Sequence, residues 1–398
     1  MQELQVDNHR CTLCGKCISA CFYDALEMDD RKLLSHDTCT LCGMCIDICP
    51  EAALAISKIK MNDMNKAEWN GILVYVEHDQ GEIHPITYEL IGKALELAKV
   101  VCYKVYCLFI GYRIAEKAKI LMHYEVEQVF MYDHASFKYY KEDIYTNAFE
   151  DCIKNHLKPS IVLIGGTEIG KSLAPSIATR FHTGLTADCT ELKIRENSDL
   201  VQIRPAFGGN IMAQIITENH RPQFAAVRYK VMSEAEPQLQ LRDNLLQCSI
   251  EDEKLKSKIE ILGVNDLAKT ESISDAKILV VVGQGFQRKE DLSLAQELAD
   301  LLNGKVASSR TLVEKGWMPY EKQIGLSGKT VKPEIIITCG VSGSIQFISG
   351  MKGSKNIIAI NTDINSPIFK IAHQPICGDL YEILPRLIKK IKSGSGKD

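Results

Sequence analysis

Eight cysteines lie within the first 49 residues and repeat one spacing twice. The segment from Cys11 to Cys21 reads CTLCGKCISAC, and the segment from Cys39 to Cys49 reads CTLCGMCIDIC. Both follow the pattern C-x2-C-x2-C-x3-C at an offset of 28 residues, and eight of the eleven positions are identical. Three thiolates spaced by two residues wrap a tight loop around one iron–sulfur cubane, so the chemistry indicated is one-electron transfer.

This spacing is that of bacterial two-cluster ferredoxins, in which the fourth cysteine of each run binds the other cluster. We therefore expect two [4Fe–4S] clusters, cluster one held by Cys11, Cys14, Cys17 and Cys49, and cluster two held by Cys39, Cys42, Cys45 and Cys21. Gly15 and Gly43 would allow the backbone to approach the sulfides closely. The first copy has Phe22 where the second has Pro50, which changes no ligand.

Two structural zinc sites are the alternative, because C-x2-C pairs also bind zinc. Zinc takes four ligands from two separated pairs, whereas here four closely spaced cysteines occur twice, so clusters are favoured. A domain of about 60 residues has a small core, and metal clusters would add stability. The other seven cysteines are expected to be small core residues: 102, 107, 152, 189, 248, 339 and 377.

Composition narrows the class of protein. The 398 residues are 45% hydrophobic and 25% charged, as in soluble globular proteins, and the net charge of −4 predicts no nucleic-acid partner. No run of 18 apolar residues occurs, and MQELQVDNHR lacks the features of a signal peptide. We expect no membrane association and a cytoplasmic location, where clustered cysteines are typically metal ligands.

The rest of the chain predicts two α/β domains. Strand and helix patterns alternate after a polar joint at 57–69, which favours parallel sheets covered on both faces. The predicted strands are GILVYVEH, YKVYCLFIGY, VEQVFMYD, PSIVLIGG, KILVVVGQG, PEIIITCG and NIIAIN, and the predicted helices include ITYELIGKALELAKVV and DLYEILPRLIKKI. The segment 195–228 is expected to be an antiparallel extension. The predicted domains are a small α+β ferredoxin domain at 1–60 and α/β domains at 68–262 and 274–398, the second of them Rossmann-like.

GGTEIGKS, from Gly165 to Ser172, matches the phosphate-binding loop G-x4-G-K-S. ATP binding through Lys171 and Ser172 is one interpretation, and an ordinary strand-to-helix turn is the other. Such a loop normally follows the first strand of its domain, and here two or more strands precede it. No good second motif follows in this domain, so the ordinary turn is favoured.

Small and polar residues cluster near several expected strand ends of the last domain. Gly340 to Gln346 follows the apolar run EIIIT and opens a helix. SSR (308–310), QIGLSGK (323–329), IAINTD (358–363) and GDL (378–380) lie near other strand ends. Ligands of open α/β sheets bind at the carboxyl ends of the strands, so these segments predict one binding site.

From about Trp69 onward the chain resembles the alpha subunit of electron-transferring flavoproteins. The resemblance covers over 80% of the chain and rests on HTGLTADCTEL (182–192), RPAFGGNIMA (204–213), HRPQFAAVR (220–228), GWMPYEKQIGLSGK (316–329) and PEIIITCGVSGSIQFISGMKGSKNIIAINTDINSPIF (333–369). It implies an FAD-binding last domain, and it places FAD on Gln284, Gly285, Ser309, Arg310, Gln323, Ile324, Gly325, Leu326, Ser327, Ser342, Gly343, Ser344, Ile345, Gln346, Phe347, Asn361, Asp379 and Leu380.

The resemblance also implies roles. Arg310 would stabilise anionic reduced flavin, unless it forms only a surface ion pair. Ser327, where the family usually has Thr, would donate to the flavin N5, unless it is only a turn residue. Amides of Gly343 to Ile345 would bind pyrophosphate or ribityl oxygens. Phe347 and Gln284 replace the His and Arg that are frequent in the family, which should lower the reduction potential.

The resemblance implies a heterodimer with a beta subunit that holds a second FAD and an NADH site. The further partners implied are ferredoxin and a flavin dehydrogenase or reductase of acyl-CoA or 2-hydroxy-acid (lactate) type. We expect an electron-transfer subunit of an oxidoreductase complex, with no catalytic residues of its own. Electron bifurcation in an acyl-CoA-reductase complex of the caffeoyl-CoA type is favoured.

The alternatives are a non-bifurcating carrier between a lactate dehydrogenase and ferredoxin, an ATP-binding iron–sulfur protein, and a scaffold that the clusters merely stabilise. The charged stretch at 250–275 is the expected hinge for rotation of the FAD domain.

Overall fold

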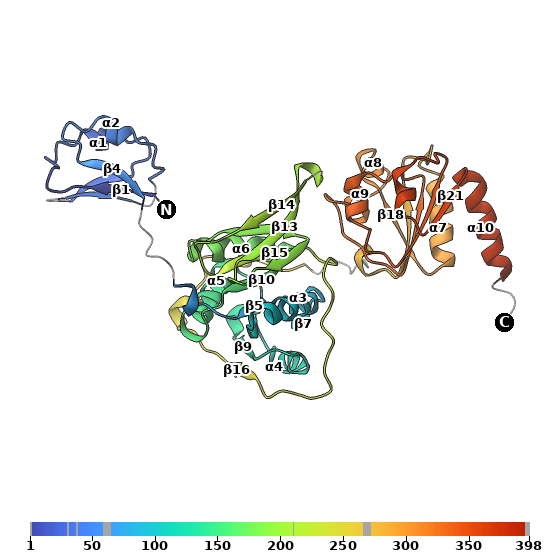
Figure 1. Cartoon of the computed structure of the whole chain (residues 1–398), viewed down its shortest axis with the longest axis horizontal. Helices are drawn as coiled ribbons and strands as arrows, with labels where there is room; N and C mark the ends of the chain where they lie inside the picture. The colour runs from blue at the N-terminus through green and yellow to red at the C-terminus, as the bar shows by residue number, and fades with distance from the viewer. Residues whose placement is uncertain are drawn as a thin grey trace. The chain divides into compact units, whose positions relative to one another are not determined.

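The computed structural model describes residues 2–29, 32–36, 39–58, 65–209, 211–265 and 272–394 (Figure 1). Its contacts divide the chain into two units, Met1–Met64 and Asn65–Asp398. The second unit contains two parallel sheets, one of seven strands and one of five. Among the described helices, none combines the length and the apolar character that crossing a bilayer requires.

The first unit is built from two similar halves around a small core. Strand β1 (Gln2–Val6) pairs antiparallel with β4 (Leu54–Lys58), and β2 (Leu26–Asp29) pairs with β3 (Lys32–Ser35). Helices α1 (Lys16–Ser19) and α2 (Met44–Asp47) occupy the same positions of the two sequence repeats. The buried core side chains are few and include two of the cysteines: Leu4, Cys17, Leu26, Leu33, Cys45 and Leu54.

A seven-stranded, fully parallel sheet organises the middle of the chain. Its order is β11 (Leu185–Cys189), β15 (Gln223–Val227), β10 (Ile161–Gly165), β5 (Ile72–Tyr75), β8 (Val105–Gly111), β9 (Gln128–Asp133) and β16 (Leu245–Gln247). The expected strands are present. Parallel strands are buried on both faces, and β5, β10 and β15 are accordingly apolar or small at almost every position.

Helices cover both faces of this sheet (Figure 1). Helices α3 (Ile86–Val101) and α4 (Ala115–Ala118) pack with one set of alternating strand residues, including Val74 and Phe109. Helices α5 (Glu142–Asp151) and α6 (Glu168–Arg180) pack with the other set, including Tyr75 and Leu108. A short hairpin of β6 (His78–Asp79) and β7 (Glu82–Ile83) follows β5.

The antiparallel extension predicted for 195–228 is correct for β13 (Leu200–Ala206) and β14 (Ile211–Ile216) and wrong for the third strand of that segment, and β12 (Glu191–Ile194) lies just before it. Strands β12, β13 and β14 form a separate antiparallel sheet. The run QFAAV instead forms β15, which lies between β10 and β11 in the parallel sheet. All five of its residues are buried, and a strand buried on both faces fits the centre of a parallel sheet.

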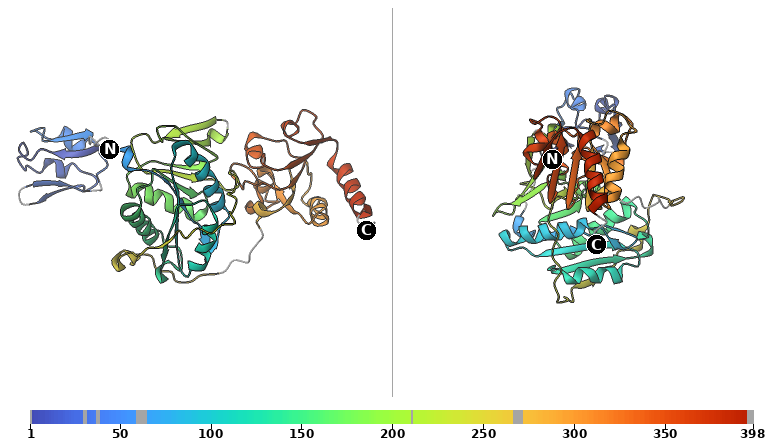
Figure 2. Two further views of the ribbon diagram at one scale, coloured as in Figure 1. Left: turned by 60° about the horizontal axis from the view of Figure 1, so that its bottom comes forward. Right: turned by 90° about the vertical axis from the view of Figure 1, so that its right-hand side faces the viewer.

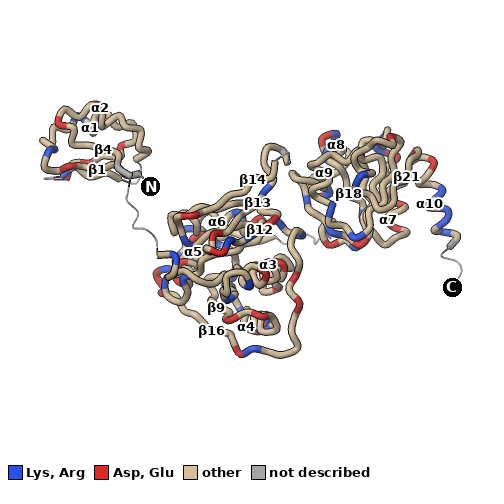
Figure 3. Tube along the Cα trace, viewed as in Figure 1, with Lys and Arg blue, Asp and Glu red and all other residues tan. Residues whose placement is uncertain are grey.

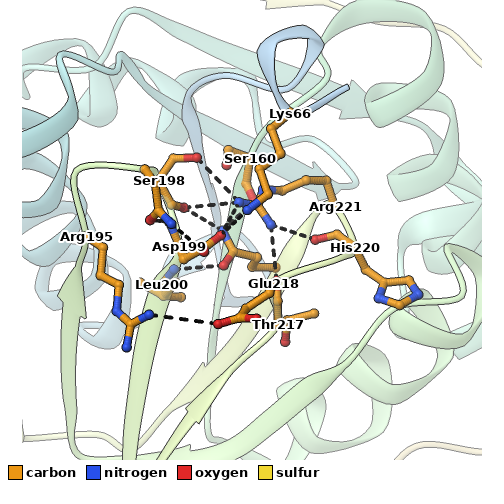
Figure 4. A network of polar contacts seen from close by, with 12 residues as sticks. Lys66, Ser160, Arg195, Ser198, Asp199, Leu200, Thr217, Glu218, His220 and Arg221 are labelled. Atoms are coloured by element: carbon orange, nitrogen blue, oxygen red, sulfur yellow. Dashed lines mark hydrogen bonds and ion pairs between the residues drawn. The ribbon is translucent and has the colours of Figure 1, made fainter. Parts of the chain in front are cut away.

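A buried ionic network fixes the entry of β13 and β15 (Figure 4). The guanidinium of Arg221 is fully buried and lies 2.7 Å from the carboxylate of Asp199, which also accepts from Lys66 at 2.8 Å. Burial opposes ionisation of Asp199, but the hydrogen bonds from Lys66 and Arg221 hold its pKa below the usual range. Removing one partner of a buried ion pair leaves an unpaired charge, so this network stabilises the start of the second unit.

The five-stranded sheet is also fully parallel, in the order β18 (Lys305–Ser308), β17 (Ile278–Val282), β19 (Ile335–Cys339), β20 (Asn356–Asn361) and β21 (Gln374–Cys377). This is the flavodoxin-like order 2-1-3-4-5, whose direction of winding reverses between β17 and β19. Helices α7 (Leu292–Leu301) and α10 (Leu380–Gly394) pack on one face, visible together in Figure 2. The other face is covered by residues of α9 (Ile345–Ser349) and the turn η9 (Pro367–Lys370). Helix α8 (Arg310–Glu314) follows β18.

The predicted hinge at 250–275 is partly packed. The turn η6 (Asp252–Leu255) contacts α5, and the carboxylate of Asp143 accepts from the Ser257 hydroxyl and the Lys258 amide, both at 2.8 Å. Positions 252–258 are therefore held, contrary to the expectation of few contacts. Positions 266–271 of the predicted hinge lie outside the described residues.

Candidate functional sites

Two small cavities in the first unit are each lined by four cysteines. The first is lined by Cys11, Cys14, Cys17 and Cys49. The second is lined by Cys21, Cys39, Cys42 and Cys45. These are the two sets expected from the repeat, in which the last cysteine of each copy joins the first three of the other copy. The eight thiols thus fit two [4Fe–4S] cubanes, which require four thiolates each.

Backbone geometry follows the repeat as closely as the cysteines do. Gly15 and Gly43 precede α1 and α2 in the left-handed region, with φ of 74° and 84°. The amide of Ala25 donates to Cys21 Sγ at 3.4 Å, and that of Ala53 donates to Cys49 Sγ at 3.3 Å. Each cavity therefore has one N–H···S bond to its crossing cysteine, and such bonds tune cluster potentials.

The zinc alternative fits the structure less well. Within the described part of the chain, no three His, Cys, Asp or Glu side chains are arranged to bind a single metal ion. The cysteines surround cavities instead of converging on a point. A cubane places its four iron-bound thiolates around a cluster core, so spread thiols fit a cluster and not one tetrahedral zinc.

The two cavities differ at the positions between the cysteines. The first is also lined by Lys16 and Glu51, and the second by Met44 and Tyr23. These are equivalent positions of the repeat, since 16 corresponds to 44 and 23 to 51. Phe22, next to Cys21, is 83% exposed. The first cavity therefore has two charged side chains in an otherwise largely apolar lining, where the second has a methionine and a tyrosine.

A much larger cavity of about 780 Å³ lies in the five-stranded domain. Its lining includes residues that follow the carboxyl end of every strand: Gly285 after β17, Ser309 after β18, Gly340 after β19, Thr362 after β20 and Gly378 after β21. Ligands of doubly wound sheets bind outside this edge, at the point where the winding reverses. The size lies within the range of cofactor pockets.

Glycines shape this cavity. A Cβ on Gly340, whose φ is 64°, would lie 2.7 Å from the Cα of Gly285. A Cβ on Gly325, whose φ is 140°, would lie 3.1 Å from the carbonyl oxygen of Gln346. These backbones can approach so closely only without side chains, which leaves room for a large ligand at the strand ends.

Fifteen of the eighteen residues expected at the FAD line this cavity: Gln284, Gly285, Ser309, Arg310, Ile324, Gly325, Leu326, Ser327, Ser342, Ser344, Gln346, Phe347, Asn361, Asp379 and Leu380. The other three, Gln323, Gly343 and Ile345, are described by the structure but do not line it. Gln323 is 3% exposed and hydrogen-bonds to Ser327, whereas Ile345 is 56% exposed. Helix α9 is a single short turn, and the Ser344 hydroxyl accepts from the Phe347 amide at its start.

Arg310 lies at the cavity and also forms an ion pair. Its side chain lines the cavity, and its Nε also donates to Glu314 Oε1 at 2.8 Å. Glu314 lies one turn later on α8 and lines the same cavity. Arg310 is therefore held by an ion pair at the site, where the charge of Glu314 partly offsets its own.

Nine lining residues were not among those expected to contact FAD: Gln287, Thr311, Glu314, Gly340, Val341, Ile360, Thr362, Gly378 and Tyr381. Five of them lie within the strand-end segments predicted to form the binding site: Gly340, Val341, Ile360, Thr362 and Gly378. Most are neighbours of expected residues at strand ends, so extending each strand-end loop by one or two positions would have found them. Tyr381 also directly follows an expected residue, Leu380. Its hydroxyl donates to Asp291 at 2.7 Å and accepts from the Gln287 amide at 2.8 Å, a contact across 90 residues or more.

The loop Gly165–Ser172 is closed by its own side chains. Thr167 begins α6, accepts from the Gly170 amide at 3.1 Å, and donates to the carboxylate of Glu77. The Gly166 amide donates to the carbonyl of Val227 at 2.6 Å. A phosphate-binding loop needs free amides and a positive field, whereas here the amides of Gly166 and Gly170 are occupied and the carboxyl group of Glu77 lies against the turn. The geometry therefore opposes ATP binding.

Burial raises the pKa of Glu77 to about 7, and the hydrogen bond from Thr167 only partly offsets this effect. Ser172 accepts from the hydroxyl of Tyr140 at 3.1 Å. Lys171 is more than half exposed and lies 3.9 Å from Asp188. Lys171 and Ser172 therefore contact different protein side chains, and these contacts do not bring the two together at one ligand.

Comparison with known proteins defines the class. The electron transfer flavoprotein domain matches residues 72–243, the electron transfer flavoprotein FAD-binding domain matches 272–352, and the 4Fe-4S dicluster domain matches 10–53. The chain is 38% identical over 344 residues to an electron transfer flavoprotein subunit alpha of Clostridium acetobutylicum, which covers 83% of this chain and 100% of that protein. The chain belongs to the electron transfer flavoprotein alpha-subunit family, and its cofactors are FAD and [4Fe–4S] clusters.

Two further relatives are informative. The Acetobacterium woodii protein described as lactate dehydrogenase (NAD(+),ferredoxin) subunit LctC is 47% identical over 372 residues, which covers 94% of this chain and 89% of that protein. The acryloyl-CoA reductase electron transfer subunit beta of Anaerotignum propionicum is 36% identical and covers 83% of this chain and 98% of that protein.

Proposed function

We propose that this chain is the FAD- and cluster-binding subunit of a complex that couples NAD(H), ferredoxin and a flavin-containing 2-hydroxy-acid dehydrogenase. A beta subunit of the electron transfer flavoprotein type supplies the NAD(H) site and a second FAD. The observation that supports this most strongly is the combination, in one chain, of an FAD-sized cavity with two four-cysteine cavities. Such a chain exchanges electrons singly through its clusters and in pairs through its flavin.

The extent of each match favours a 2-hydroxy acid over an acyl-CoA. The first unit is 64 of 398 residues, so a match over 94% of the chain must include the cluster-binding segment. The acryloyl-CoA reductase relative matches 83%, a share that the second unit alone can supply. A lactate-type dehydrogenase is therefore the better candidate for the terminal partner, and the caffeoyl-CoA type becomes the second.

The proposed ligands follow from the cavities. Cys11, Cys14, Cys17 and Cys49 bind one cluster, and the other four clustered cysteines bind the second. FAD occupies the cavity of the five-stranded domain. When it is bound there, it supplies redox chemistry by hydride and electron exchange. Arg310 stabilises negative charge on the reduced cofactor, and Ser327 donates a hydrogen bond to its N5. Phe347 is buried at this site and donates no hydrogen bond, which keeps the potential low.

The test is anaerobic reconstitution of the chain with a beta subunit and a lactate-type dehydrogenase. NAD-linked oxidation of lactate is measured with and without reduced ferredoxin. We expect turnover only when ferredoxin is present, because coupling makes each electron path depend on the other. Equal turnover without ferredoxin would instead identify a plain, non-bifurcating carrier. Turnover with an enoyl-CoA and none with lactate or pyruvate would identify the acyl-CoA class.

A further inference from the structure

We infer that Gln323 is a positioning residue that directs the hydroxyl proton of Ser327 into the FAD cavity. The inference rests on the proposed function, in which this cavity holds the flavin. Gln323 is 3% exposed and does not line the cavity, whereas Ser327 does. The side-chain amide Nε2 of Gln323 donates to Ser327 Oγ at 2.9 Å.

The direction of this hydrogen bond decides what Ser327 can do. A serine hydroxyl has one proton and two acceptor lone pairs. Because its oxygen already accepts from Gln323, the proton of Ser327 is left free and points away from the amide. In a cavity-lining residue, a free proton is available to an acceptor atom of the ligand. Without Gln323 the hydroxyl would rotate freely and would act as a donor or an acceptor.

The turn that joins the two residues is held at both ends. The amides of Gly325 and Lys329 bond to the carbonyls of Lys329 and Gln323, at 3.2 and 2.8 Å. The Leu326 amide donates to the carbonyl of Gln346 at 3.0 Å. A Cβ on Gly328 would lie 2.4 Å from the carbonyl oxygen of Gln323, so this close approach of the turn requires glycine at 328. The separation of the two side chains is therefore set by the backbone.

Packing around Gln323 also restricts its own rotation. Its backbone pairs with Ser308 at the end of β18, and its neighbour Ile324 is 1% exposed within the core of the domain. The hydroxyl of Tyr320 donates to the carbonyl of Ser327. A buried amide that is fixed in this way holds the Ser327 hydroxyl in one orientation. Such a preorganised donor can shift the reduction potential of a bound flavin.

The experiment is a double-mutant cycle on the anaerobically purified chain with its beta subunit. Gln323→Met retains the approximate volume but removes the donor, and Ser327→Ala removes the hydroxyl. The readouts are the dissociation constant for FAD and the midpoint potential of the bound flavin. We expect each single variant to raise the dissociation constant about tenfold, the effect of one hydrogen bond. The double variant should equal Ser327→Ala, because Gln323 acts only through Ser327.

Gln323→Glu is the second variant. Burial raises the pKa of a carboxyl, as it does at Glu77, so this variant is measured at pH 9. There the carboxylate accepts the serine proton and draws it away from the cavity, so the potential should fall below that of Gln323→Met at the same pH. In a Ser327→Ala background, Gln323→Glu should retain only the long-range effect of its charge. Ser327→Thr keeps the hydroxyl and should behave like the unmodified chain.

Three results are distinguishable. Additive effects in the double-mutant cycle would overturn the inference and assign Gln323 an independent role. Variants that lose FAD and also unfold at a lower Tm, followed by Trp317 fluorescence, report misfolding of the FAD-binding domain. The cycle is then completed with Gln323→Glu, whose carboxyl group preserves polarity, and additivity there also overturns the inference. An unmodified chain that binds no FAD in this domain would refute the proposed function itself.

Discussion

The carboxyl edges of the two parallel sheets are used in opposite ways. At the seven-stranded sheet, the strand-to-helix loop after β10 is closed by Thr167 and the buried carboxylate of Glu77. At the five-stranded sheet, residues after all five strands surround a cavity of about 780 Å³. The sequence of the loop after β10 matches a phosphate-binding motif letter for letter, whereas none of the loops named at the edge of the five-stranded sheet does. The lesson is that an edge becomes a site when small residues leave it empty, whatever motif its loop matches.

The carboxyl edge of the five-stranded sheet, which surrounds the cavity, is called the open edge, and that of the seven-stranded sheet the closed edge. Filling the open edge should have the largest effect on FAD binding. We predict that Gly340→Ala loses most bound FAD while cluster iron stays unchanged, because its Cβ would lie 2.7 Å from the Cα of Gly285. Gly316→Ala is the matched control, since Gly316 also has positive φ, 69°, but has nothing within 4 Å of its Cβ. Both variants incur about 1–2 kcal/mol of backbone strain. FAD and iron contents of the purified proteins are the measurement, and equal FAD loss in both variants would contradict the prediction.

The closed edge should reveal itself in the pH dependence of stability. The folded pKa of Glu77, about 7, lies above its ordinary value of 4.5, so the native state binds more protons between these values. Its contribution therefore favours folding at low pH and is lost as pH rises from about 4.5 to 7, by roughly 3 kcal/mol.

We predict that Glu77→Gln flattens this pH dependence. The measurement is the Tm reported by Trp69 fluorescence in a Trp317→Phe background, from pH 5 to pH 8. Glu89, also buried with its pKa raised to about 7, contributes in the same direction and is the comparison variant. A Tm profile of Glu77→Gln that is parallel to that of the unmodified chain would show that the carboxylate is not proton-bound in the fold.

The midpoint potential of the flavin at the open edge should respond to a hydrogen-bond donor at position 347. We predict that Phe347→His raises the midpoint potential of the bound flavin, because an imidazole can donate a hydrogen bond where the phenyl ring cannot. A tenfold change in the ratio of reduced to oxidised flavin corresponds to about 30 mV for a two-electron couple. Spectroelectrochemical titration is the measurement, with Phe347→Leu as control. An unchanged potential would remove Phe347 from the tuning of the flavin.

The smallest effect is expected at Lys171. We predict that Lys171→Ala leaves FAD content, iron content and turnover unchanged and alters the free energy of unfolding by less than about 0.5 kcal/mol, since the side chain is more than half exposed. Equilibrium dialysis against Mg-ATP tests the alternative directly. Binding of ATP by the unmodified chain that is abolished in Lys171→Ala would mean that the loop opens.

Surface charge gives a further contrast between regions. Figure 3 shows a run of basic residues along the C-terminal helix α10, where Arg386, Lys389, Lys390 and Lys392 lie. The first 64 residues, by contrast, contain ten acidic and six basic side chains. The sequence of the cluster-binding unit therefore carries a net negative charge, whereas α10 is basic.

Spacing along the chain was enough to predict the cluster-binding unit. The eight cysteines surround two cavities in the sets that the repeat implies. Local backbone geometry places the first three cysteines of each run together, and the internal repeat brings the fourth cysteine of the other run beside them. The helix expected at 86–101 has the same bounds in the structure, since its apolar periodicity is long and ends at Cys102 with positive φ. Most of the FAD cavity was also predictable, because strand-end loops of a parallel sheet converge on one edge.

Tertiary structure decided what depends on residues far apart in sequence. The sequence by itself determined which cysteines are grouped by spacing, which runs are strands and where small residues open a sheet edge. Only the fold revealed that β15 is inserted into the parallel sheet, that Glu77 closes a loop 90 residues away, and that Gln323 lies behind Ser327 instead of in the cavity. The physical reason is that local spacing sets which groups are available, whereas strand order and side-chain packing set which of them meet.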